Sequence, residues 1–191
     1  IANKNNINFF MGSDKNLVLR NLQAANKYNL DHLIRVTGDS PLISYELINE
    51  LISNHLKRDS DYSYNNNLPL GTRSEIINVK ALKFIYENTK TSKYGEYLSL
   101  YFKNNKKLIK CNKVDFRSEY NFKKIRLNLD YESDYNFIND LLNFFNYKKT
   151  ISLNEIFLYL TFFHKKNKYI LSKYQSPSLS AKIKLDTKIH D

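Results

Sequence analysis

Two aspartates each end a short apolar segment that is typical of a β-strand. Asp39 ends the segment LIRVTGD (residues 33–39), and Asp130 ends the segment IRLNLD (residues 125–130). In open α/β sheets, ligands bind beyond the carboxyl ends of the strands. If both segments lie in one sheet, the two carboxylates converge at its edge. Two carboxylates together with substrate phosphates commonly hold Mg²⁺, which neutralises charge on a phosphate under attack.

The same two aspartates also fit a structural role. Asp39 precedes Ser40-Pro41, and Asp130 precedes a segment with helical periodicity, so each is placed to cap a helix or to form a turn. Spacing alone does not separate a metal-binding pair from two caps. Both interpretations therefore stay open on the residues themselves.

The segments around these aspartates alternate between apolar strands and amphipathic helices. Strands are expected at 7–10, 32–36, 61–64, 75–79, 108–114 and 124–129. Helices are expected at 14–28 behind Ser13, after Ser44, at 81–88, 94–103 and 134–145, and from a capping box at Ser152 to about 164. Gly71 ends a turn signal at 68–71. This order predicts an α/β domain whose first strands are parallel.

Composition limits the classes of protein that this chain can belong to. Its 191 residues suit one domain, and 42% hydrophobic residues are enough for a core. No segment approaches the roughly 18 apolar residues of a membrane span, so we expect no membrane insertion. A single cysteine, Cys111, excludes an internal disulfide and indicates a reducing, cytoplasmic setting.

A net charge of +11 would attract anions in general, including nucleotides and nucleic acids. The lysines are scattered rather than gathered in one arm, which favours a solvated surface. A basic nucleic-acid-binding protein is therefore the hypothesis that we rank last of three, and we expect no nucleic-acid partner.

Five short motifs, in order, resemble segments of the bacterial sugar cytidylyltransferases, namely the spore-coat polysaccharide type and the synthetases of CMP-activated acidic sugars. They are FMGS with the following helix (10–28), RVTGDSPLI (35–43), LPLGTRSE (68–75), GEYLS (95–99) and IRLNLD continuing to Asp134. Each motif is weak alone, but their shared order makes the combination fairly specific. The resemblance covers roughly residues 9–145.

This resemblance implies a three-layer α/β fold of the glycosyltransferase-A type around a mixed sheet. It implies the reaction of CTP with a sugar to give CMP-sugar and pyrophosphate, with Mg²⁺ held by Asp39 and Asp130. Gly71 and Glu75 match a loop that lies beside the sugar, and Glu96 matches a further substrate-binding position. Arg73 stands where many members have Asp; it favours an acidic group on the sugar, or it is an exposed turn charge.

The resemblance also shapes the expected domain organisation. We expect a cytidylyltransferase domain at 1–150, a helical extension of it at 151–176 and a loosely ordered polar tail at 177–191. The family's N-terminal strand and its G-x-x-R nucleotide-binding loop have no match, so we expect an N-terminally incomplete chain. The partners expected are CTP and an acidic or amino sugar, with a homodimer contact through the C-terminal helices.

The missing match motivates a second hypothesis of another class, a catalytically inactive relative that acts as an interaction module. A complex with a partner enzyme that does not depend on nucleotide would support it.

Overall fold

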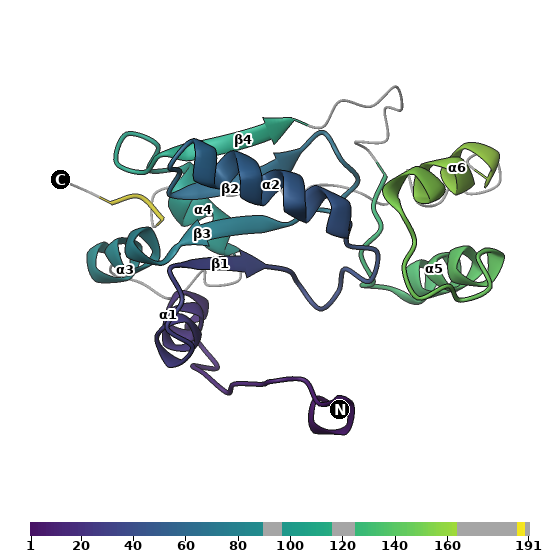
Figure 1. Cartoon of the computed structure of the whole chain (residues 1–191), viewed down its shortest axis with the longest axis horizontal. Coiled ribbons are helices and arrows are strands. Elements are labelled where there is room, and N and C mark those ends of the chain that lie inside the picture. Colours follow the sequence, from purple (N-terminus) through teal and green to yellow (C-terminus); the bar gives the residue numbers. More distant parts are fainter. Residues whose placement is uncertain (90–96, 116–124, 164–186, 190–191) are drawn as a thin grey trace.

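A computed structural model describes residues 1–89, 97–115, 125–163 and 187–189. A 3-10 turn, η1 (Asn3–Asn5), comes first. The helices and strands that follow are α1 (Leu17–Lys27), β1 (His32–Arg35), α2 (Tyr45–Lys57), β2 (Tyr62–Asn66), β3 (Glu75–Asn78), α3 (Val79–Asn88), α4 (Leu98–Lys103), β4 (Cys111–Asp115), α5 (Glu132–Phe144) and α6 (Leu153–Phe163). Helices surround a four-stranded mixed sheet, as Figure 1 shows, and the expectation of an α/β fold with a mixed sheet is confirmed.

The sheet has the strand order β1-β3-β2-β4. β3 pairs antiparallel with β1 and β2, whereas β2 and β4 pair in parallel. It follows that β1, β2 and β4 run in one direction and end at the same edge. In this register Glu75 of β3 lies opposite Arg35 of β1 on one side and Tyr64 of β2 on the other.

Helices cover both faces of the sheet because its strands alternate apolar side chains. Ile76 of β3 packs on Leu51 of α2, while the next residue, Ile77, packs on the other face with Val18 of α1 and Leu82 of α3. α2 is started by Ser44, whose hydroxyl accepts from the amide of Leu47, as its sequence predicted. The result is three layers with the sheet in the middle.

The pair α5 and α6 lies beyond the edge at which β1 and β4 end (Figure 1). A separate apolar core joins the two helices to the loops from the sheet, through residues such as Leu42, Leu68, Leu127, Leu141 and Phe157. The predicted capping box is present: the amide of Ser152 donates to Glu155, and the amide of Glu155 donates to Ser152. α5 and α6 therefore pack against the loops that follow β1 and β2.

Several expected elements differ from the structure. Residues 7–10 form no strand, since no described strand pairs with them and Ile7 and Phe9 stay exposed. α1 begins at Leu17 with Asn16 as its cap, three residues later than predicted, because the hydroxyl of Ser13 accepts from the amide of Asn16 instead. Asn65 and Asn66, expected in a loop, extend β2.

Residues 125–129 are not a strand of the sheet, in contrast to the prediction. They form one isolated parallel bridge, between Leu70 and Arg126. The amide of Leu127 donates to the carbonyl of Leu70, and the amide of Leu129 donates to that of Asp39. The segment divides its hydrogen bonds between two loops, so its apolar pattern reflects burial against those loops.

The described part of the C-terminal tail is packed rather than loose. The side chain of Asn105 donates to the carbonyl of Thr187 and accepts from the amide of Ile189, and Thr187 is fully buried. On α6, Leu158 and Phe162 are exposed, and the expected dimer contact there stays a prediction.

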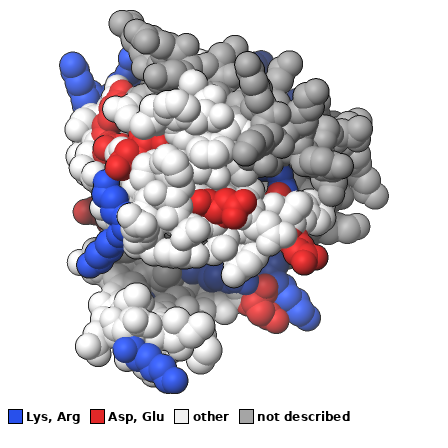
Figure 2. All heavy atoms as spheres, turned by 90° about the vertical axis from the view of Figure 1, so that its right-hand side faces the viewer, with Lys and Arg blue, Asp and Glu red and all other residues white. Residues whose placement is uncertain are grey.

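Within the described ranges, no helix has the length and apolar character needed to cross a membrane. On the face toward α5 and α6, the described surface is mostly uncharged, and the Lys and Arg side chains lie near its margins (Figure 2).

Candidate active site

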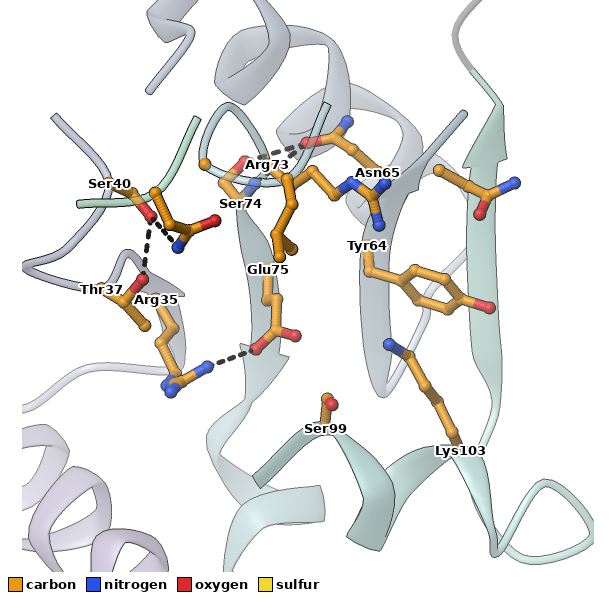
Figure 3. A pocket seen from close by; sticks show the side chains of 14 residues that line it. Arg35, Thr37, Ser40, Tyr64, Asn65, Arg73, Ser74, Glu75, Ser99 and Lys103 are labelled. Atoms are coloured by element: carbon orange, nitrogen blue, oxygen red, sulfur yellow. Dashed lines mark hydrogen bonds and ion pairs between the residues drawn. The ribbon is translucent and has the colours of Figure 1, made fainter. Parts of the chain in front are cut away.

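A cleft of about 290 Å³ opens where the loops after β1 and β2 meet residues 125–130. Figure 3 shows side chains from several elements that point toward it. The lining residues are Arg35, Thr37, Ser40, Tyr64, Asn65, Asn66, Leu70, Gly71, Arg73, Ser74, Glu75, Ser99, Lys103 and Asn128. Four of the sequence motifs, at 35–43, 68–75, 95–99 (through Ser99) and 125–130, therefore contribute to one concave surface.

Backbone hydrogen bonds hold three of these motifs together. Leu70 and residues 125–127 exchange two bonds, of 3.2 Å from the amide of Leu70 to the carbonyl of Ile125 and 2.7 Å from the amide of Leu127 to the carbonyl of Leu70. The amide of Leu129 donates across 2.8 Å to the carbonyl of Asp39. The two aspartate segments are therefore bonded to each other outside the sheet, and the convergence of their carboxylates stays a prediction.

Gly71 allows the loop after β2 to approach residues 127–128 closely. Its φ of +96° lies in the region that L side chains rarely adopt, and a Cβ there would lie 2.5 Å from the carbonyl carbon and oxygen of Leu127. Glycine is therefore required by both conformation and space. In the structure Gly71 lines the cleft by bringing backbone to it.

The carboxylate of Asp39 lies beside the cleft, bonded to two residues that line it. Its Oδ2 accepts from Nδ2 of Asn128 at 2.9 Å, and its Oδ1 accepts from the hydroxyl of Ser40 at 3.3 Å. Partial burial alone would raise the pKa of Asp39, but hydrogen bonds from Thr37, Asn128 and Ser40 outweigh it and lower the pKa below its usual value. Asp39 is therefore kept ionised.

Asp130 follows the 125–129 segment, and its side chain is 45% exposed. Its Oδ2 accepts from the guanidinium of Arg126, which also pairs with Asp134. Asp130 does not cap α5: Tyr131 is at the N-cap position, and the carboxylate of Asp134 accepts from the amides of Asp130 and Tyr131. Asp134 therefore accepts the hydrogen bonds that form the turn and cap α5. Asp130 lies at the surface beside the loop of Asp39.

No group of three or more His, Cys, Asp or Glu residues that could hold a metal ion occurs among the described residues. Mg²⁺ is commonly bound by one or two protein carboxylates, while substrate phosphates and water complete its coordination shell. Asp39, kept ionised, and Asp130, whose described contacts use only Oδ2, fit that partial donor set. Their role in metal binding stays a prediction.

Glu75 lies in the floor of the cleft and has a partner for each oxygen. Oε2 accepts from Arg35 at 3.0 Å, and Oε1 accepts from the hydroxyl of Tyr62 at 2.7 Å. Burial, and then the charge and hydrogen bond of Glu75, raise the pKa of Tyr62 well above its usual value, so Tyr62 stays a hydrogen-bond donor. Remaining lone pairs on Glu75 could still accept from a ligand.

Arg73 lines the cleft and is partly buried, so it is not the exposed turn charge that one interpretation expected. Its Nε donates at 2.9 Å to the carbonyl of Leu68, and its Nη2 bonds to the same oxygen. This bond fixes the loop and leaves guanidinium surface toward the cleft. Glu96, the remaining predicted substrate-binding residue, lies outside the described residues.

Two further cleft residues carry no specific signal in the sequence. Lys103 at the end of α4 is one lysine among many, and Asn128 is one asparagine among many. Asn128 is buried, and its Oδ1 has no hydrogen-bond partner among the residues that the structure describes. A buried acceptor without a partner is costly, so an unpaired acceptor that lines a cleft marks a contact for a ligand or water.

Comparison with known proteins connects this site to a family. Residues 6–166 match the family model described as cytidylyltransferase. The chain is 31% identical over 146 residues to an uncharacterized protein of Methanocaldococcus jannaschii, a match that covers 76% of this chain and 60% of that protein. It is 27% identical over 154 residues to the spore coat polysaccharide biosynthesis protein SpsF of Bacillus subtilis, a match that covers 80% of this chain and 64% of that protein. The chain thus spans less than two thirds of the length of these relatives.

A solved structure agrees with these matches. A cytidylyltransferase from Leptospira borgpetersenii superposes with a TM-score of 0.78 at 25% sequence identity, over 91% of this chain and 72% of that one. The family match at residues 6–166 contains every described residue that lines the cleft.

Proposed function

The chain belongs to the cytidylyltransferase family, and on that premise we propose that its protein transfers the cytidylyl group of CTP to a sugar that is used in surface polysaccharide. A sugar hydroxyl oxygen forms a bond to the α-phosphorus, and the bond from that phosphorus to the bridging oxygen breaks. Pyrophosphate leaves, and the hydroxyl proton passes to solvent. Because the chain spans about three fifths of the length of its relatives, this activity is proposed for the whole protein.

The convergence of three loops on one cleft is the observation that carries this proposal. The loop of Asp39, the loop of Gly71 and the segment that ends at Asp130 are bonded to one another through their backbones. A reaction between a nucleotide and a sugar requires a surface that holds both partners in a fixed relative position. Short, direct contacts between these loops supply that rigidity.

Asp39 and Asp130 are the residues that would hold Mg²⁺ in this proposal. When bound, the ion would neutralise the negative charge of the triphosphate. The chain's own contribution is to keep the carboxylate of Asp39 ionised, which its hydrogen bonds from Thr37, Asn128 and Ser40 achieve. Arg126 orients Asp130 by pairing with one of its oxygens.

The sugar would lie over the row formed by Arg35, Glu75 and Tyr64. Hydroxyl groups need both donors and acceptors, and the cleft supplies acceptors at Oδ1 of Asn128 and at Glu75. Arg73 adds a donor that is held in place by the carbonyl of Leu68. These groups are on strands or tightly bonded loops, which suits selective binding of a polar ring.

Pyrophosphate release from CTP tests the proposal. The protein is incubated with CTP, Mg²⁺ and a panel of neutral, amino and acidic sugars, and pyrophosphate is measured against reactions without sugar. The expected result is release that depends on both Mg²⁺ and a sugar, and CMP-sugar is then identified by mass. Absence of sugar-dependent release with every sugar would contradict the proposal.

A further inference from the structure

Lys103 brings to the wall of the cleft a cation whose partners, in the described part of the chain, are aromatic rings alone. It is the last residue of α4, and its ammonium lies 4.1 Å from the ring centroid of Tyr64 and 5.8 Å from that of Tyr62. Within the described ranges it makes no hydrogen bond and no ion pair. A lysine that is partly buried normally finds a carboxylate, so this arrangement requires a reason.

The carboxylate that lines the cleft does not supply that partner. The negative charge of Glu75 acts on Lys103 through space, but the two oxygens of Glu75 accept hydrogen bonds from Arg35 and Tyr62. Burial lowers the pKa of Lys103, the charge of Glu75 opposes that shift, and the charge of Arg73 adds to it. Among the described residues that line the cleft, the cations Arg35, Arg73 and Lys103 outnumber the one carboxylate, Glu75.

The position of Lys103 separates it from the proposed metal-binding carboxylates. Figure 3 shows Thr37 and Ser40 on one side of the cleft and Tyr64 and Lys103 on the other. Asp39 is bonded to Ser40, so phosphates held near Asp39 belong to the first side. An anion at Lys103 is therefore a different group from the phosphates of the nucleotide.

We propose that Lys103 is a specificity-determining residue that binds an anionic group of the acceptor sugar, a carboxylate or a phosphate, and so selects acidic sugars. The inference rests on the proposed function, which puts a sugar in this cleft. The anion supplies the negative partner that the ammonium lacks, and Tyr64 limits the directions from which it approaches. Arg73, on the neighbouring loop, reinforces the preference for negative charge.

The melting temperature of a Lys103 variant distinguishes a ligand-binding role from a purely structural role. If Lys103 served to hold α4 on the sheet through its contacts with Tyr64, its removal would lower the melting temperature. If it is an unpaired cation kept for a ligand, Lys103→Met removes a desolvated charge and keeps the apolar stem, so the melting temperature without ligand stays equal or rises. This measurement needs no substrate.

Binding is then measured by calorimetry in the presence of CTP and Mg²⁺ with three probes: glucuronate, glucose 6-phosphate and glucose. The parent is expected to bind at least one acidic probe more tightly than glucose. Tighter binding of glucuronate would indicate a site for a carboxylate, and tighter binding of glucose 6-phosphate a site for a phosphate. Lys103→Met should weaken that binding about 10- to 100-fold, the typical effect of losing a charge-assisted hydrogen bond. Lys103→Arg should retain more of it, and Lys107→Met, a change of the same charge at an exposed lysine, should have no effect.

Three binding results would overturn the inference. Equal binding of acidic and neutral probes by the parent is one, and unchanged acidic-probe binding in Lys103→Met is another. The third is loss of CTP binding in Lys103→Met, which would assign the residue to the nucleotide. Sugar-dependent pyrophosphate release that is restricted to neutral sugars would keep the proposed function and reject only this inference.

Discussion

Asn128 donates from its Nδ2 to Oδ2 of Asp39 across 2.9 Å, although 89 residues separate the two in the chain. This single bond joins the loop after β1 to the segment that leads into α5. It also leaves Oδ1 of Asn128 as a buried acceptor that has no partner in the described ranges of the chain. One amide therefore orients a carboxylate with its nitrogen and presents its oxygen for a ligand.

Loss of that amide should raise the pKa of Asp39. In Asn128→Ala the carboxylate loses a donor that favours its ionised form, so its pKa moves up toward the usual value. The shift is read by NMR titration of the Asp39 carboxyl carbon. Asn136→Ala, at an exposed position of α5, serves as the control and should leave it unchanged. An unaltered titration in Asn128→Ala would show that Thr37 and Ser40 suffice.

Neutralisation of either candidate metal carboxylate should lower sugar-dependent pyrophosphate release. We expect Asp39→Asn and Asp130→Asn each to reduce the rate by about 100-fold or more, because a metal contributes several kcal/mol of charge stabilisation in the transition state. Asp140→Asn changes an exposed carboxylate of α5 and should keep the parent rate. Each variant is checked for folding by circular dichroism. Full activity in both variants would reject the metal assignment.

The backbone geometry at Gly71 predicts a large effect from one methyl group. Gly71→Ala should lower the free energy of unfolding by at least about 2 kcal/mol, because φ is +96° and the new Cβ would meet the carbonyl of Leu127. Gly38→Ala is the matched control, since nothing lies within 4 Å of its Cβ position. Urea unfolding of both variants gives the comparison. Similar losses in the two would mean that the loop adapts to the methyl group.

Buried His55 predicts a stability that falls in mild acid. Burial, and then the charge of His32, lower the pKa of His55 from 6.5 to about 4 in the folded state. Between these values the unfolded state takes up the proton first, so the free energy of unfolding falls as pH falls from about 6.5 to 4, by up to ~3 kcal/mol.

Urea unfolding at a series of pH values checks this dependence. The parent should lose stability across that window, and His55→Gln should show a flatter curve there. Parallel curves for the two proteins would assign the acid sensitivity to other groups.

The contact of residues 187–189 with Asn104 and Asn105 predicts that two alanine variants lose stability to different extents. Asn105→Ala should lower the free energy of unfolding by about 2 to 4 kcal/mol, because it removes the hydrogen bonds that the Asn105 side chain makes to the carbonyls of Tyr101 and Thr187 and to the amide of Ile189. Asn104→Ala loses only a bond to the Thr187 hydroxyl and should cost about 1 kcal/mol. Thermal unfolding compares them, and an equal, small effect in both would mean that the tail contributes little.

The sequence by itself determined the local elements and the family. Ser44 and Ser152 predicted helix starts that the structure confirms, because caps act through neighbouring amides a few residues away. Short segments rich in apolar and aromatic residues predicted β1, β2 and β3 within a residue or two, since strands of a buried sheet carry such side chains. The ordered motifs predicted the family that the comparisons support.

Only the tertiary structure decided how distant segments meet. Residues 125–129 read as a strand, yet they form a bridge, because hydrogen bonds to Leu70 and Asp39 were available and a full strand partner was not. The role of Lys103 had no local signal, since it depends on Tyr64, Glu75 and Arg73 from other elements. Periodicity reports which residues are buried, whereas partners across the chain decide which polar groups are paired and which remain available to a substrate.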